Sequence, residues 1–78
     1  MDTRQLLAKL ADVLALPPDQ VSPGTHLNGD NWDSVAVLAT IAMADESLGV
    51  SVSGNRLTRC TSVQQILDLM EEAVAQKQ

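Results

Sequence analysis

Hydrophobic residues recur at helical spacing near the start of the chain. In about residues 3–15 the apolar positions are Leu6, Leu7, Leu10, Val13 and Leu14. Asp2 or Thr3 can cap the start of this stretch, and Pro17 with Pro18 ends it. The pattern therefore predicts an amphipathic helix over about residues 3–15.

A second helix is predicted over about residues 34–48. Asp33 before it is a good N-cap whose charge suits the positive helix end, and Gly49 after it is a typical stop. The positions that the pattern turns inward are Val37, Leu38, Ile41, Ala44 and Leu48. The connection between the two helices, residues 17–32, is rich in turn formers, and connections this long in small domains are often functional.

The last predicted helix starts after Ser62, which forms a capping box with Gln65 three residues later. Its apolar face consists of Val63, Ile66, Leu67, Leu69, Met70 and Val74. A short helical turn with Leu57 facing inward is expected around residues 54–59. Residues 50–52 are expected to form an extended loop, because so short a strand would have no partner.

The length of the chain limits the number of domains. With 78 residues there is room for one core, so we predict a single domain over residues 1–78. Its fold class is all-α, a four-helix bundle of three long helices and one short helix.

The net charge is −5, with 10 acidic against 5 scattered basic residues. This argues against nucleic acid and anionic membrane surfaces as partners, because both bind basic patches.

The cysteine count and the start of the chain indicate a compartment. One Cys and one His form neither an internal disulfide nor a zinc site. The first residues do not resemble a secretory signal, and no apolar run approaches the ~20 residues of a bilayer span. We therefore expect a free-standing, cytoplasmic protein without a metal centre.

Candidate catalytic residues are few. His26 is the only neutral-pH base, and its place in the long connection is typical of a loop residue. Cys60 lies in an apolar setting and is expected to be a buried small hydrophobe. Ser34 lacks the glycines of a nucleophile elbow. No convergent catalytic set is visible, so we do not expect an enzyme.

The most informative segment is residues 29–35, which place Ser34 in the first turn of the second helix after a long loop. A helix N-terminus offers free N–H groups and a positive dipole end, so it suits a phosphate. From local chemistry alone, Ser34 either helps to cap the helix or carries a phosphoester.

This segment and its surroundings resemble the acyl carrier protein family. The family signature Asp-Ser-Leu at the start of the second helix reads Asp33-Ser34-Val35 here. The resemblance covers almost the whole chain and includes Val21-Ser22-Pro23, Thr25-His26-Leu27, the run from Asp45 to Val50, Val52 and Thr61-Ser62-Val63. The tripeptide is common by chance, whereas its placement on this layout is specific.

The resemblance implies a function for Ser34 and Asp33. Ser34 would be esterified with phosphopantetheine by a phosphopantetheinyl transferase, with coenzyme A as donor and Mg²⁺ as metal. Asp33 would help the transferase and its metal to find the serine. The thiol of the arm would hold acyl groups as thioesters for acyl-loading and acyl-transferring enzymes. The protein itself would be a non-catalytic carrier. It would be a monomer, because a carrier must exchange partners and a permanent interface over the second helix would block them.

Departures from the family pattern suggest a dedicated partner. Val35 replaces the usual Leu, and Ala36 and Ala39 stand where the family often has acids that attract basic enzymes. Steering towards generic fatty-acid synthase enzymes is therefore expected to be weak. We expect a carrier of a specialised pathway that docks through Val35, Ala36, Ala39 and Met43.

Several alternatives stay open at this point. Trp32-Asp33-Ser34 favours acyl or polyketide cargo, because peptidyl carriers more often show Gly-Gly-His/Asp-Ser. An aminoacyl or peptidyl carrier and an unmodified helical adaptor are the alternatives; a small enzyme or a DNA-binding helix-turn-helix fits less well. The small residues Thr40 and Ala44 either leave room for an acyl chain or let three larger residues fill the interior. Those three are Met43, Met70 and Trp32.

Overall fold

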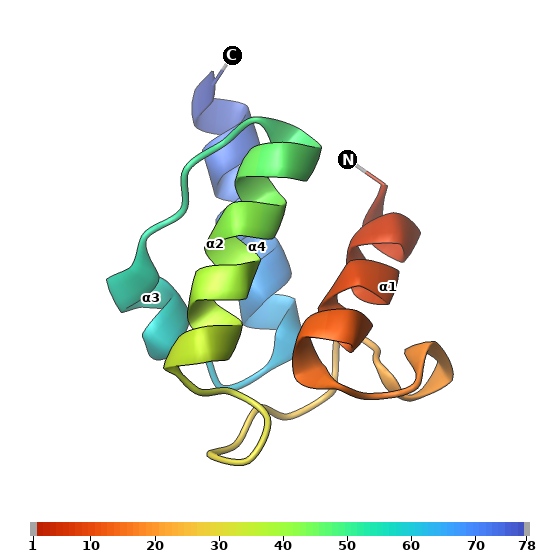
Figure 1. Cartoon of the computed structure of the whole chain (residues 1–78). Coiled ribbons are helices and arrows are strands. Elements are labelled where there is room, and N and C mark those ends of the chain that lie inside the picture. The colour runs from red at the N-terminus through yellow and green to blue at the C-terminus, as the bar shows by residue number, and fades with distance from the viewer. Residues whose placement is uncertain (1, 78) are drawn as a thin grey trace.

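The computed structural model describes residues 2–77 as an all-α fold, as predicted (Figure 1). Its elements are α1 (Thr3–Leu14), a 3₁₀ turn η1 (Pro18–Gln20), α2 (Ser34–Leu48), α3 (Gly54–Thr58) and α4 (Val63–Lys77). The three long helices, the short helix and the loop between α1 and α2 are all confirmed. Residues 50–52 lie in a loop without strand pairing.

Side chains and backbone conformation set the helix ends. Asp2 caps α1 by accepting a hydrogen bond from the Arg4 N–H at 3.0 Å. Gly49 ends α2 with φ +65°, a left-handed conformation that glycine adopts without a Cβ penalty. The turn η1 was not predicted; Pro18 at its first position has a ring that presets the helical φ.

The start of α4 depends on the long loop. Ser62 Oγ accepts from the Gln65 N–H at 3.4 Å, as a capping box requires, but Gln65 Oε1 accepts from the Thr61 N–H at 2.7 Å instead of from Ser62. Ser62 also pairs with His26 in an isolated antiparallel bridge. The loop carbonyls of residues 25 and 23 accept the first helical N–H groups, at 2.9 and 2.8 Å. The loop is thereby fastened to α4.

The core is aliphatic and lies between the long helices. Its largest side chains without exposure are Leu10, Leu57, Ile66, Met70, Val63 and Thr40. Leu57 faces inward from α3, as predicted. Trp32, Met43 and Met70 are all buried, so they occupy the interior beside the small residues of α2. Among the described residues, none of the helices has both the length and the hydropathy needed to cross a bilayer.

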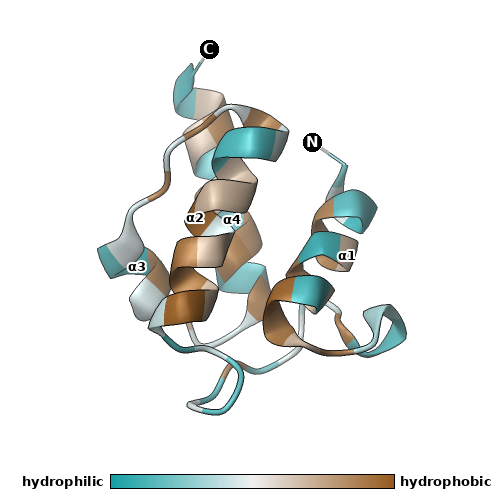
Figure 2. Cartoon of the chain, viewed as in Figure 1, coloured by the Kyte–Doolittle hydropathy of each residue, from teal (hydrophilic) through white to brown (hydrophobic). Residues whose placement is uncertain are grey.

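The rotation of α2 differs from the prediction. Leu38 was expected to face inward and is 66% exposed, whereas Ala36, Thr40 and Ala44 are buried. These three small residues follow one another at four-residue spacing, which forms a narrow ridge that neighbouring helices can approach closely. The Thr40 hydroxyl donates to the Ala36 carbonyl at 2.8 Å, so its burial leaves no unpaired polar group. The first half of α2 is hydrophobic on most sides (Figure 2), so its sequence periodicity does not indicate which face is buried.

Candidate functional site

Ser34 is the first residue of α2, and its side chain is exposed. The turn that precedes it is held by its own side chains. Asn28 Oδ1 accepts from the Asp30 N–H at 2.8 Å, and Asn31 Oδ1 accepts from the Asn28 N–H at 2.9 Å. Asn favours such local bonds, which compete with regular structure and stabilise turns. The chain therefore enters α2 from an ordered turn.

Trp32 anchors this turn to the rest of the fold. Its side chain is buried, and its indole Nε1–H donates to the Leu57 carbonyl of α3 at 2.8 Å. A buried indole needs such an acceptor, because an unpaired N–H would be costly. Two residues before Ser34, the backbone is thus tied to α3.

Asp33 is the N-cap of α2. Its backbone is extended, and its Oδ1 accepts from the Ala36 N–H at 2.9 Å. A negative charge at this end is favourable because of the helix dipole, and the same end attracts a phosphate. The cap fixes where α2 begins and so places the Ser34 hydroxyl in solvent, beside an exposed carboxylate.

The residues considered for catalysis lie elsewhere. His26 is exposed and contributes its backbone to the bridge with Ser62, so it is a loop residue as predicted. Cys60 is buried, which raises the pKa of its thiol, and its Sγ contacts the Arg56 carbonyl at 3.5 Å. The prediction of a buried small hydrophobe is confirmed. Neither residue converges with Ser34 on a common site.

The predicted docking residues do not share one surface. Val35 is 71% exposed and Ala39 is half-buried, but Ala36 and Met43 are in the core, so the expectation that these two lie on the outer surface is wrong. They are buried because α2 turns its small-residue ridge inward. The exposed residue that the sequence reasoning missed is Leu38. Nothing in the periodicity singles it out, since its neighbours are also apolar.

Comparisons with known proteins agree with this geometry. Residues 4–70 match the family described as "Phosphopantetheine attachment site". The chain is 35% identical to an acyl carrier protein of Streptomyces coelicolor over 80 aligned positions, which cover 95% of this chain and 87% of that protein. No solved structure gives a significant match. With an attachment-site match over most of its length, the chain belongs to the phosphopantetheine attachment family of carrier proteins, which are non-catalytic.

Proposed function

We propose that Ser34 carries the phosphopantetheine arm and that the chain is an acyl carrier protein of a specialised pathway. The observation that supports this most directly is the exposed hydroxyl of the first residue of α2, inside the matched region. The residues present fit the group. The hydroxyl makes no hydrogen bond to any residue in the described range 2–77, and the helix end tolerates the charge of a phosphodiester.

The residues next to Ser34 have different roles in this function. Asp33 holds the start of α2 and offers a carboxylate to the transferase and its Mg²⁺. Trp32 keeps the preceding turn on α3, so the attachment point is fixed while the arm moves. When bound, the arm supplies a thiol that holds acyl groups as thioesters. The bundle then raises the effective concentration of the tethered group at each partner enzyme. A reducing cytoplasm would keep that thiol free.

The cargo and the docking surface follow from two further observations. The relative from Streptomyces is described as an acyl carrier protein, which favours acyl over aminoacyl cargo. The outward residues Val35, Leu38 and Ala42, here called the outer stripe, are exposed and apolar. Acidic residues follow only at the far end of α2, at Asp45 and Glu46. The stripe, with half-buried Ala39 beside it, suits partner enzymes with an apolar contact surface.

Intact mass measurement tests the attachment. The protein is incubated with coenzyme A, Mg²⁺ and a broad-specificity phosphopantetheinyl transferase. We expect a mass increment of one arm, which disappears in Ser34→Ala and persists in the control Ser51→Ala, a change of another exposed serine. An arm on Ser34→Ala would refute the assignment. A pathway that still runs with Ser34→Ala would favour the unmodified adaptor.

Loading kinetics test the outer stripe. Leu38→Glu places a charge next to Val35 without entering the core, and Ala75→Glu places the same charge at an exposed position of α4. We expect Leu38→Glu to raise the KM of the loading enzyme for the holo carrier, while Ala75→Glu leaves it unchanged. Equal effects of the two variants would show that net charge, rather than this surface, governs docking.

A further inference from the structure

The turn before α2 contains an asparagine followed by a glycine, Asn28 and Gly29, and both residues are exposed. The Cγ atom of an asparagine can be attacked by the backbone nitrogen of the next residue, which closes a succinimide ring and releases ammonia. A glycine in the next position has no side chain to shield that nitrogen. The reactivity of the pair then depends on the attacking nitrogen, the side-chain carbonyl and the leaving amine.

The attacking nitrogen of this pair is not engaged. Within residues 2–77, the Gly29 N–H donates to no acceptor. A Cβ built on Gly29 would meet no atom within 4 Å, so the space beside it is open. The nitrogen can therefore lose its proton to a solvent base and reach the neighbouring side chain without first breaking a hydrogen bond.

The side-chain carbonyl is polarised by the turn itself. Asn28 Oδ1 accepts from the Asp30 N–H at 2.8 Å and from the Asn31 N–H at 3.2 Å. When the nitrogen attacks Cγ, this oxygen becomes negatively charged, and donors that already point at it lower the barrier, as in an oxyanion hole. The Asn28 Nδ2 group, which leaves as ammonia, makes no hydrogen bond to the described part of the chain.

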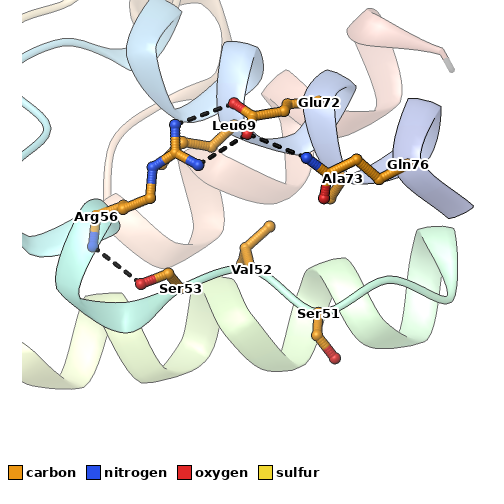
Figure 3. Close-up of a pocket in the computed structure, with 8 residues that line it drawn as sticks. All are labelled: Ser51, Val52, Ser53, Arg56, Leu69, Glu72, Ala73 and Gln76. Atoms are coloured by element: carbon orange, nitrogen blue, oxygen red, sulfur yellow. Dashed lines mark hydrogen bonds and ion pairs between the residues drawn. The ribbon is translucent and has the colours of Figure 1, made fainter.

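The other asparagines are each followed by a nitrogen that is already bonded. After Asn31, the Trp32 N–H donates to a turn carbonyl at 2.8 Å. After Asn55, the Arg56 N–H donates to Ser53 Oγ at 3.3 Å, in the lining of one of the hollows between α3 and α4 (Figure 3). These two asparagines therefore serve as internal controls for the one in front of the glycine.

The products of the reaction differ in what they do to the turn. Water opens the ring at either carbonyl, which gives aspartate or isoaspartate at position 28. In isoaspartate the main chain runs through Cγ, and the former backbone carbonyl becomes a carboxylate outside it. In the amide form that carbonyl accepts from the Asn31 N–H at 3.2 Å and from the Trp32 N–H at 2.8 Å. Isoaspartate therefore changes the path of the chain just before Ser34.

We propose that Asn28 is a site of spontaneous deamidation and that its isoaspartyl form accepts the phosphopantetheine arm slowly. The Gly29 nitrogen bonds to Asn28 Cγ, the bond from Cγ to Nδ2 breaks, and Nδ2 leaves as ammonia with the proton that the attacking nitrogen gave up. Water then adds to a ring carbonyl, and the bond from that carbonyl to nitrogen breaks. The second part of the proposal rests on Ser34 as the attachment residue and names a regulation of that site.

Incubation in mildly alkaline buffer tests the deamidation. Peptide mass mapping follows the exchange of amide for acid at each asparagine, and labelling with an isoaspartyl methyltransferase identifies isoaspartate. We expect the exchange at Asn28 and not at Asn31 or Asn55. Its rate should rise with pH, because the attacking nitrogen must lose its proton. No exchange at Asn28 would overturn the inference.

Glycine variants separate the site from general ageing. Gly29 has a φ outside the left-handed region and open surroundings, so Gly29→Ala fits without strain. We expect this variant to slow the exchange severalfold, because the methyl group shields the nitrogen. Gly24→Ala, the same change at another glycine with open surroundings, should leave the rate unchanged. Equal rates in the Gly29→Ala variant and the unchanged protein would contradict the attack by this nitrogen.

Loading of the separated forms tests the consequence. The isoaspartyl form carries one more carboxylate, so ion exchange separates it, and it is incubated with coenzyme A, Mg²⁺ and the transferase. We expect its initial rate of mass increment to be about tenfold lower than that of unaged protein, since a displacement of about 1 Å can cost up to about 100-fold. Asn28→Asp keeps an oxygen for the Asp30 and Asn31 N–H groups and should load at the unchanged rate.

The outcomes distinguish this inference from the proposed function. Equal loading of the isoaspartyl form and the unaged protein would overturn the regulation, while the arm on Ser34 leaves the proposed function standing. Unaged protein that acquires no arm on Ser34 would refute the proposed function and the regulation together.

Discussion

Trp32 joins the turn before Ser34 to α3, so its replacement by Phe should destabilise the fold by a calculable amount. The indole N–H bond to the Leu57 carbonyl is lost, which costs about 1 kcal/mol. The carbonyl still accepts from the Cys60 N–H, so it is not left unpaired. The smaller ring also leaves part of a buried site unfilled, which costs about another 1 kcal/mol. We therefore expect Trp32→Phe to lower the free energy of unfolding by about 2 kcal/mol.

Urea denaturation followed by far-UV circular dichroism measures this loss. Fluorescence is unsuitable, because Trp32 is the only tryptophan in the sequence. For a domain of this size the loss corresponds to a fall in Tm of roughly 8–16 °C. The control Leu38→Ala, at a 66% exposed position, should stay within about 0.5 kcal/mol of the unchanged protein. A Trp32→Phe protein as stable as this control would refute the reasoning.

Three further predictions concern charge, backbone and thiol. The Arg56 guanidinium lowers the pKa of Glu72 through a hydrogen bond and its charge, so this ion pair stabilises the fold above the ordinary pKa of 4.5, and the contribution is lost as pH falls through the lowered value. The difference in unfolding free energy between the unchanged protein and Glu72→Gln should therefore shrink as urea titrations move below pH 4.5; a constant difference would contradict the pairing. Gly49→Ala should lower the free energy of unfolding by about 1–2 kcal/mol in thermal melts, because φ is +65° there and the added Cβ would approach Lys77 Nζ to 2.8 Å, while Gly49→Asn should cost less. Burial raises the pKa of the Cys60 thiol, so a disulfide reagent at pH 8 should react at least about tenfold more slowly with the folded protein than with the protein in urea, and equal rates would refute the burial.

The helix ends could be predicted because the residues that set them act locally. Asp33, Gly49 and Ser62 each stop or start a helix through their own side chain or backbone, so the bounds of α2 and the start of α4 agree with the sequence. Ser34 at the start of α2 follows from the same reasoning. Its role as attachment residue does not follow from capping alone and comes from the family resemblance.

Features that depend on distant packing could not be predicted. Leu38 faces solvent and Ala36 faces the core, the reverse of the prediction. The reason is that α2 is apolar on most sides, so only contact with the neighbouring helices fixes its rotation about its own axis. Ser62 pairs with His26 of the long loop, and Gln65 bonds to Thr61 instead of to Ser62, contacts that no local motif reveals. The hollows between α3 and α4 exist only once these two helices are placed side by side.

The placement of the first and last helical turns has a practical consequence. The first turn of α1 and the last turn of α4 lie at one end of the molecule, and the first turn of α2 lies at the other (Figure 1). Immobilising the protein on a sensor surface through either end would therefore leave Ser34 facing the solution. Kinetics of transferase and partner binding can then be recorded without the linker obstructing the serine.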